Sequence, residues 1–396
     1  MRHKVIREYG GRGKMKRDYK IWLLGILILV VGLTLLVISH FFPSFSQCYA
    51  TKIYQNIFPP ISLLVSNIPF SIYEILILLL SIFIIFGIIR DIIRLFSKLG
   101  REKLKKDIKK IPLRLIYTIA ILLIVFVFTA GINYARESYT DYIGIEAQPS
   151  HPEELIHLYH RLLEQTAEII KYVEADSSGY FILNRENILE EAQSSLSNLN
   201  KIYGGLGHIF PRAKTLLFSR YVFDNFGFEG FFSPFTLEAH YNHNAPSTKI
   251  PFLITHELAH AVGYMREEEA NFIAFLACKY SDNTDFQYSG HFEALLYTLG
   301  ALRRDINREY YAELYFMMPE QVIRDINARI SYLQRFEGST TVVVSQRVND
   351  AYLKMNRQED GIKSYGRMVD LLLAYYRVYY PPPSPTTTQD ILGGLN

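Results

Sequence analysis

The pentapeptide His256-Glu257-Leu258-Ala259-His260 brings together residue types that can bind a metal and activate water. In a helix, residues four apart lie one turn apart on the same face, so both imidazoles can reach one ion. Glu257 projects about 100° round the helix from His256, beside the metal rather than on it. A general base for a metal-bound water belongs at that place. The pattern therefore predicts a catalytic Zn²⁺ site with one ion per chain.

A catalytic zinc site needs three protein ligands and one open position, and three glutamates compete for the third place. Gly263 favours a helix end just after the motif, and Glu267, Glu268 and Glu269 open a second helical pattern. We expect Glu267 to be the ligand, because Asn271 lies four residues later and can support a ligand histidine. Glu269 is the second choice and Glu268 the third.

The motif followed by Glu267, Ala270 and Asn271 resembles the gluzincin class of zinc metallopeptidases. In that class a glutamate on a second helix is the third ligand, and Asp or Asn four residues later supports a histidine. The spacing is unusual, since only six residues separate His260 from Glu267 where many gluzincins have tens. It is nearer to the metzincin pattern, but Arg266 stands where a metzincin has its third histidine, and arginine cannot bind zinc.

A longer stretch, from Gly230 to Tyr376, resembles a bacterial membrane family, domain of unknown function 3810. The shared pieces are Phe231-Phe232-Ser233-Pro234-Phe235-Thr236, Thr255 to His260, Glu269-Ala270-Asn271-Phe272, Val348 to Lys354 and Ser364 to Asp370. The resemblance extends over most of the chain, including its apolar N-terminal segments. It implies a metallopeptidase-like site and names no substrate.

The chemistry expected of this site is hydrolysis of a peptide bond in a peptide or protein substrate. Bound zinc would polarise the scissile carbonyl and acidify its water, while Glu257 would carry the water's proton to the leaving amine. The developing oxyanion needs a further donor. The candidate donors are His291, Tyr288, Tyr365 and Arg367.

A non-catalytic protein is the alternative hypothesis. A zinc-binding sensor or scaffold of the cell envelope would bind a partner and cut nothing. The presence of Glu257 favours catalysis, because a purely structural zinc site has no need of a base. We find no basic patch on a folded region, so nucleic acid is not an expected partner.

Three apolar stretches of about 20 residues lie in the first third of the chain, at 21–42, 70–89 and 115–134. The first and third contain no Lys, Arg, Asp or Glu, and the second contains only Glu74. Each is long enough to cross a bilayer as a helix. We therefore expect a membrane domain over residues 1–134 with three transmembrane helices, and the lipid bilayer as a partner.

The charges around these stretches predict their orientation. Residues 1–20 hold eight Lys and Arg against two acidic residues, and residues 90–114 hold ten against three. By the positive-inside rule both segments are cytoplasmic, which places everything after Tyr134 outside the cytoplasm. That remainder is acidic, with 23 basic and 33 acidic residues.

Residues 135–380 are expected to form an extracytoplasmic metallopeptidase-like domain of the α+β class, mainly helical, with a small sheet beside the HExxH helix. Apolar periodicity predicts helices over 150–175, 184–203, 290–307, 310–317, 319–336, 349–356 and 364–379. Residues 381–396, rich in Pro and Thr, predict a disordered tail.

Aromatic and β-branched residues predict strands over 216–223 and 230–237. Pro234 indicates that the second strand is bulged or at a sheet edge. An edge strand beside the motif can pair with an extended peptide, and Phe231, Phe232 and Phe235 are candidates for its side-chain pockets.

Overall fold

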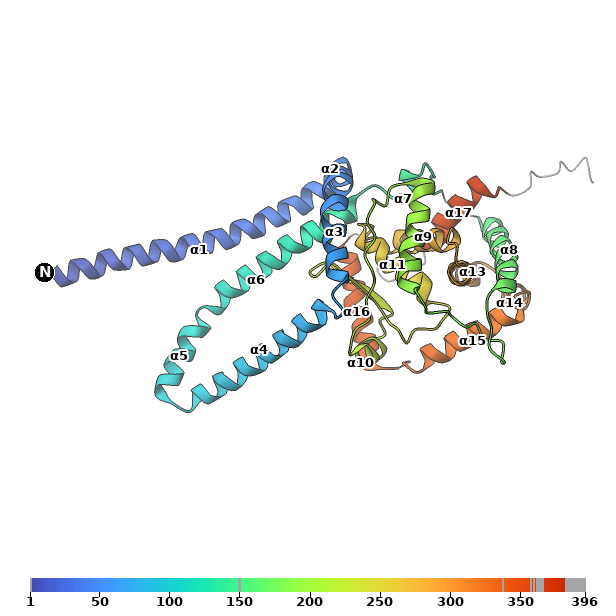
Figure 1. Cartoon of the computed structure of the whole chain (residues 1–396). Coiled ribbons are helices and arrows are strands. Elements are labelled where there is room, and N and C mark those ends of the chain that lie inside the picture. Colours follow the sequence, from blue (N-terminus) through green and yellow to red (C-terminus); the bar gives the residue numbers. More distant parts are fainter. Residues whose placement is uncertain are drawn as a thin grey trace, which may run out of the picture.

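A computed structural model describes residues 2–148, 151–336, 338–356, 358, 360 and 367–381, with the backbone alone for 2–19 and 219–222. Long apolar helices extend from one end of a mainly helical domain (Figure 1). Tyr365 and the tail expected over 382–396 lie outside the described residues.

Within the described part of the chain, three helices are long and apolar enough to cross a membrane, as the sequence predicts. The first, Lys20–Phe41, is the latter part of α1 (Arg2–Phe41). The second is α4 (Ile72–Leu95), which begins at Ile72 because the Ser71 hydroxyl caps it by accepting from the Glu74 amide.

The third apolar helix, Ile111–Ala135, changes its winding where it enters the domain. It consists of α6 (Ile111–Phe126), the π-helical turn η2 (Val127–Gly131) and the 3₁₀ turn η3 (Ile132–Ala135). Single π turns inside α-helices occur often at functional sites. At the far end of the apolar helices, α5 (Lys98–Ile108) joins α4 to α6 (Figure 1).

The connection between the first two apolar helices folds against the domain. It contains α2 (Pro43–Cys48), the π-helix η1 (Tyr49–Tyr54) and α3 (Gln55–Ser66). The Ser62 hydroxyl donates to the carbonyl of Leu237 at 2.6 Å. Helix α3 therefore lies across the end of the domain from which the apolar helices leave (Figure 1).

The centre of the domain is formed by α11 (Ile250–Ala261), α12 (Glu267–Lys279) and α13 (Thr284–Asp305). Every residue of α11 is buried, as expected of a helix that is apolar on nearly all sides. Around these three helices pack α8 (Pro152–Ile169), α9 (Ile188–Tyr203) and α17 (Met368–Tyr379). The outer elements are α7 (Tyr139–Tyr142), η4 (Ile170–Tyr172), α10 (Ser219–Phe226), α14 (Arg308–Phe316), α15 (Glu320–Gln334) and α16 (Thr340–Met355).

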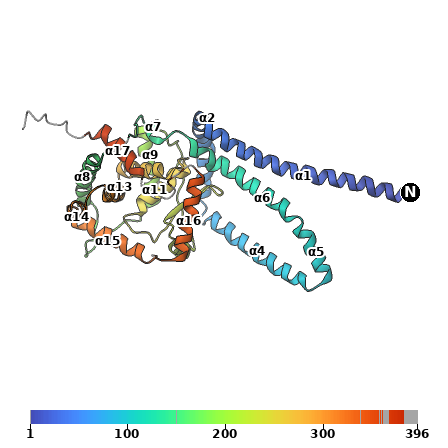
Figure 2. The ribbon, with the colours of Figure 1, turned by 180° about the vertical axis from the view of Figure 1, so that it is seen from behind.

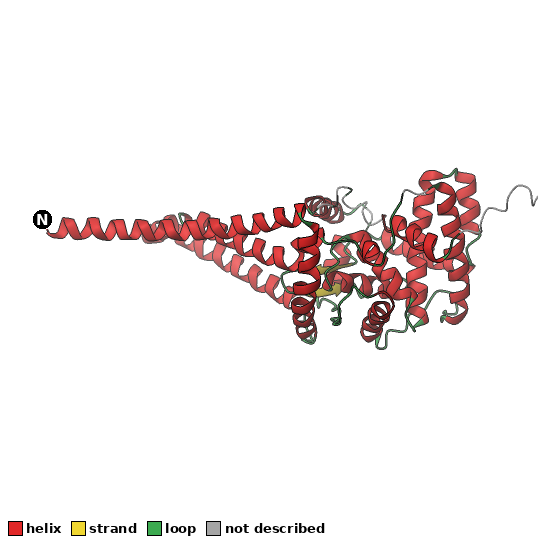
Figure 3. Cartoon of the chain, turned by 90° about the horizontal axis from the view of Figure 1, so that it is seen from above, coloured by secondary structure: helices red, strands yellow, loops and turns green. Residues whose placement is uncertain are grey.

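The described residues form one antiparallel pair of strands, β1 (Gly230–Ser233) and β2 (Glu238–Tyr241). Phe231 is opposite His240, and the strands contact α11. They lie at the end of the domain nearest the apolar helices (Figure 3). The prediction of a small sheet beside the HExxH helix is confirmed, although Pro234 lies in the turn between the strands rather than within one.

The strand predicted over 216–223 is wrong, because this segment leads into helix α10. The amides of Leu217 and Phe218 donate to the carboxylate of Glu74, each at 2.8 Å, rather than to a neighbouring strand. Helix α10 then ends on Gly227, whose φ of 69° is the left-handed conformation typical of a helix end. The apolar side chains of Leu217 and Phe218 are exposed beside the second apolar helix.

Candidate metal centre

Helix α11 positions the two histidines and the glutamate of the motif. It begins with Pro251 in its first turn, where proline is tolerated, and His256, Glu257 and His260 are all buried. The histidine rings lie one helical turn apart, with centroids separated by 4.7 Å and planes at 86°. Both Nε2 atoms therefore approach one point from the same helix face.

A tight turn returns the chain to this point. The amide of Gly263 donates to the carbonyl of His260 at 2.9 Å, and that of Tyr264 donates to Ala259 at 3.1 Å. These two bonds, with a φ of 100° at Gly263, form a Schellman helix end. The predicted left-handed helix end at Gly263 is confirmed. Helix α12 then starts at Glu267, whose side chain points back at the histidines.

Three donor atoms converge at the spacing that a tetrahedral zinc site requires. The Nε2 atoms of His256 and His260 are 3.1 Å apart, and Oε2 of Glu267 lies 3.2 Å and 3.5 Å from them. Zinc–ligand bonds of about 2.0–2.1 Å at tetrahedral angles place neighbouring donors about 3.3 Å apart. Within the described residues these three side chains are the one group of His, Cys, Asp and Glu that could hold a metal ion. The residues present fit zinc.

The outer nitrogens of the two histidines have different surroundings. Nδ1 of His260 faces the carbonyl oxygen of Tyr264 at 2.7 Å, which fixes its proton there and leaves the Nε2 lone pair for a metal. Nδ1 of His256 is buried without a hydrogen-bond partner. Asn271, expected to support a histidine, is buried and donates to the Tyr297 hydroxyl at 3.4 Å. The predicted support from Asn271 is therefore not formed at Nδ1 of His256.

Glu257 lies beside the three donors and opposite strand β1. Its Oε2 atom is buried without a hydrogen-bond partner. A pocket of about 130 Å³ is lined by Glu257 and the three donor residues, with room for a metal ion and several waters. Strand β1 and its turn contribute Phe231, Phe232 and Pro234 to this pocket. Phe235, the third expected pocket residue, does not line it.

Burial and the charges of neighbouring groups shift the pKa values of the four titratable side chains of the site. Burial raises the pKa of Glu257 to about 8. Burial works against the charged forms of His260 and Glu267 too, but their mutual attraction outweighs it. The pKa of His260 is therefore raised to about 9, and that of Glu267 is lowered to about 2. The pKa of His256 is lowered, mainly by burial. A carboxylate at Glu267 and an uncharged His256 are the forms that bind a cation, whereas His260 must release its Nε2 proton when a cation binds.

The model of one known protein family matches this chain over residues 49–373, a region that includes the motif, Glu267 and two of the apolar helices. The description of that family is "Protein of unknown function (DUF3810)". The chain belongs to this family. No curated protein and no solved structure matches the chain.

Glu268 and Glu269, the other two glutamates at the start of α12, point away from the two histidines. Glu269 forms an ion pair with Arg266 through two contacts of 2.8 Å and accepts from the amide of Tyr139 at 2.9 Å. Glu268 accepts from the side chain of Gln358 at 2.6 Å. Of the three glutamates, the structure brings only Glu267 to the histidines.

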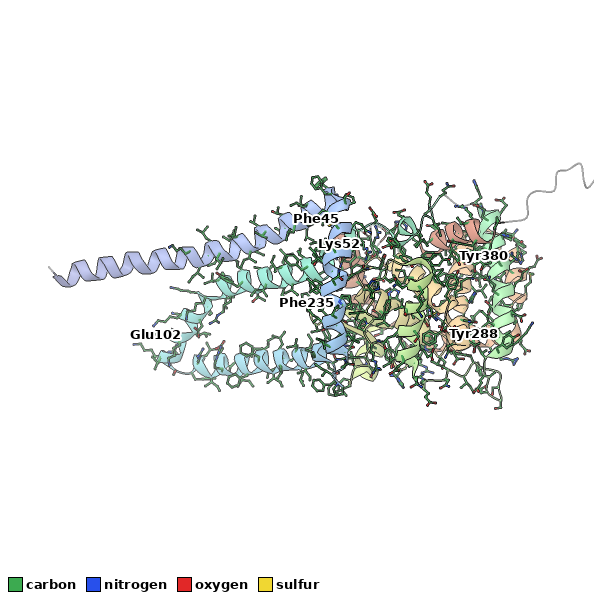
Figure 4. All side chains as sticks on the ribbon, turned by 45° about the horizontal axis from the view of Figure 1, so that its top comes forward. Phe45, Lys52, Glu102, Phe235, Tyr288 and Tyr380 are labelled. Atoms are coloured by element: carbon green, nitrogen blue, oxygen red, sulfur yellow. The ribbon has the colours of Figure 1, made fainter. Side chains whose placement is uncertain are left out.

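Three of the four predicted oxyanion donors lie in the described part of the chain, and none of these three lines the pocket. Tyr288 donates to Asp325 at 2.6 Å, deep in the domain and away from the apolar helices (Figure 4). Nδ1 of His291 faces the carbonyl of Gln287 at 2.8 Å. Arg367 pairs with Asp360 at 3.4 Å on the surface, and Tyr365 is outside the described residues. None of the three described candidates is placed to contact a substrate held at the donors.

Two tyrosines that the sequence analysis did not single out line the pocket instead. Tyr134, at the end of the third apolar helix, donates from its hydroxyl to that of Tyr352 on α16 at 3.2 Å. Desolvation, together with the negative charge of Glu267, raises the pKa of Tyr352, so its hydroxyl keeps its proton. Tyr352 lies in the stretch Val348 to Lys354, one of the pieces that resemble the family. That resemblance is the feature of the sequence that could have indicated a role for Tyr352 in the site.

Proposed function

We propose that this protein is a membrane-anchored zinc metallopeptidase that hydrolyses peptide bonds with Glu257 as the general base. The observation that supports this most directly is the convergence of the donor atoms of His256, His260 and Glu267 at tetrahedral spacing. A structural zinc site is closed by four ligands, whereas three ligands leave a position for water or substrate. A buried carboxylate beside three ligands is the arrangement of a hydrolytic site.

Each side chain has a distinct role in this proposal. His256, His260 and Glu267 would hold zinc, which would act as a Lewis acid, acidifying a bound water and polarising a carbonyl. Glu257 takes a proton from the attacking water and gives it to the leaving nitrogen. Burial raises the pKa of Glu257, and a bound zinc ion would lower it, which favours the carboxylate that a general base needs.

Two further features serve the substrate. The side chains of Tyr134 and Tyr352 line the pocket, and their hydroxyls are our candidates to donate to a developing oxyanion. In the described chain β1 pairs with β2 along one edge, and its other edge can pair with an extended peptide. Phe231 and Phe232 would then contact the substrate side chains.

The test measures metal content and hydrolysis on the full-length protein in detergent. We expect about one zinc per chain by elemental mass spectrometry, and loss of zinc in His256→Ala and Glu267→Ala. Glu257→Gln should keep zinc and lose cleavage of a mixed peptide library. Zinc without cleavage by the wild type would favour a zinc-binding sensor or scaffold. A folded protein without zinc, even after zinc is supplied, would overturn the proposal.

We further propose that the domain lies at the outer face of the cytoplasmic membrane, with the N-terminus in the cytoplasm, from the basic charge of residues 1–20 and 90–114. Glu102 lies at the opposite end of the apolar helices from the domain (Figure 4), and Glu309 is exposed on the domain. In a Cys48→Ser background, an impermeant maleimide added to intact cells should label Glu309→Cys and not Glu102→Cys. The reverse labelling would overturn the orientation.

A further inference from the structure

The wall of the metal-site pocket is partly built by an apolar, membrane-spanning element. Ala130 and Tyr134 line the pocket together with His256, His260 and Glu267. Ala130 is five residues before the end of the apolar helix Ile111–Ala135, which is about 7.5 Å along a helix. The pocket is therefore at the level where this helix leaves the bilayer.

Helix α3 holds the domain at that level. One face of α3 and of the last turn of η1 before it is fixed to the domain, since the Tyr54 hydroxyl donates to the carbonyl of Ala261 at 3.4 Å and the Gln55 side-chain amide donates to the carbonyl of Gly205 at 2.7 Å. The opposite face exposes an apolar stripe at helical spacing. Its members are Ile53, Ile57, Ile61 and Leu64, which are 41–71 % exposed.

The occupant that fits this stripe is lipid. The connection that contains α3 joins two apolar helices directly, the first ending at Phe41 and the second starting at Ile72. With both helices across the bilayer, as proposed above, α3 lies at the bilayer surface. It crosses the ends of the apolar helices in both Figure 1 and Figure 2. A helix with one apolar face and one face bound to protein rests in the headgroup region with its apolar side toward the acyl chains.

The domain is tied to the second apolar helix as well. The carboxylate of Glu238 on β2 accepts from the amides of Ile72 and Tyr73 at 2.9 Å and 2.8 Å, and it pairs with Lys214 at 2.9 Å. These contacts are at the first turn of α4. With α3 they allow the domain little freedom to tilt away from the membrane.

The rim of the pocket continues the apolar surface. Tyr352 of α16 packs against Phe126 of the third apolar helix, with ring centroids 6.4 Å apart. Val348 and Met355 lie on the same face of α16, four residues before and three after Tyr352, and are 64 % and 86 % exposed. Helix α16 stands at the membrane end of the domain (Figure 2). A substrate that enters beside α16 therefore passes over apolar side chains next to the bilayer.

We propose that the substrate is a membrane-anchored polypeptide, cut in the first residues that emerge from the bilayer, and not a freely soluble peptide. This inference rests on the proposed peptidase function. An anchored chain diffuses in the plane in which the pocket opens, so its effective concentration at the site is raised. It can also reach the edge of β1 without leaving the membrane surface. A soluble peptide must approach an apolar rim that lipid covers.

The experiment uses the full-length protein with zinc in proteoliposomes. The probe is a Leu/Ala transmembrane helix followed by a 30-residue randomised segment, and the comparison is the same segment without the anchor. We expect the anchored segment to be cut at least tenfold faster. The cuts should fall in its first ten residues or so, which span about 33 Å when extended. Cleavage positions are read by mass spectrometry, with Glu257→Gln as the inactive control.

The outcomes separate this inference from the function on which it rests. Equal cutting of free and anchored segments, or cuts spread evenly along the segment, would overturn the inference and leave the peptidase intact. No cutting of either segment by zinc-loaded wild type would overturn the proposed function, and the inference with it.

A pair of variants tests the role of α3 without touching the metal site. Ile57→Glu combined with Ile61→Glu places charge on the lipid-facing stripe and should slow cleavage of the anchored segment about tenfold without changing zinc content. Phe316→Glu is the matched control, because Phe316 is equally apolar, 75 % exposed and on α14 at the far end of the domain (Figure 1). Equal rates in the stripe variant and the control would contradict the proposal.

Discussion

The carboxylate of Glu257 lies against the backbone of Gly230, the first residue of β1. A methyl group on Gly230 would lie 2.5 Å from Oε1 of Glu257 and 2.8 Å from the carbonyl oxygen of His240. Strand β1 can approach the proposed base this closely because residue 230 has no side chain. The strand that would bind the peptide therefore also fixes the position of the base that would activate the attacking water.

Gly230→Ala should consequently impair hydrolysis more than metal binding. The added methyl group must push Glu257 or β1 aside, and a displacement near 1 Å can cost about 10²-fold in rate. Zinc content should stay near one per chain, because the three donors do not contact Gly230. Gly300→Ala on α13 is the matched control, since a methyl group there meets nothing within 4 Å. Wild-type activity in Gly230→Ala would show that Glu257 needs no support from β1.

Tyr352→Phe removes one proposed oxyanion donor and keeps the aromatic ring on Phe126. We expect kcat to fall about 10²-fold with little change in KM, because the bond forms mainly in the transition state. Tyr134→Phe should act in the same direction, and the double variant should cost less than the product of the two losses, since the hydroxyls contact each other. An unchanged kcat in both single variants would assign the oxyanion to another donor.

The features of this site that the sequence predicts are local ones. His256, Glu257 and His260 are fixed by helical spacing, and Gly263 by the φ of its helix end. The apolar stretches are likewise visible in composition alone. Each of these depends on neighbours within a few residues, so a pattern in the sequence carries it.

What the sequence does not reveal depends on distant contacts. Tyr134 and Tyr352 are 218 positions apart and meet only after the third apolar helix packs on α16. Leu217 and Phe218 have strand-like composition, but their amides bind Glu74 from another part of the chain. Asn271 has the spacing to reach a histidine, yet it donates to Tyr297.

Glu267 and Glu269 should respond differently to substitution. Glu267→Gln removes a ligand charge and should lower zinc affinity. Glu269→Gln should keep zinc, because its partners are Arg266 and Tyr139. It should instead destabilise the fold by about 3 kcal/mol, since Arg266 loses a largely buried charge partner. Zinc content and thermal unfolding of the two variants test this, and loss of zinc in Glu269→Gln at an unchanged unfolding temperature would reverse the assignment.

The ion pair between Glu154 and Arg377 should make stability depend on pH. Arg377 on α17 contacts both carboxylate oxygens of Glu154 on α8, at 2.8 Å and 2.7 Å. The hydrogen bonds from the Arg377 guanidinium are the main reason that the pKa of Glu154 is lowered to about 2. Because the pKa of Glu154 is lowered in the folded state, the ion pair stabilises the fold above the unfolded pKa near 4.5, and this stabilisation is lost as pH falls toward 2.

Because both side chains are partly exposed, we expect the pair to add about 1 kcal/mol to the free energy of unfolding at pH 7, or about 2–4 °C to the unfolding temperature. Glu154→Gln should show that deficit at pH 7 and less than half of it at pH 3, whereas Glu164→Gln, in an exposed pair with Arg161, should match the wild type at both. A deficit of the same size at pH 3 and pH 7 would mean that α17 is held to α8 by packing and not by this pair.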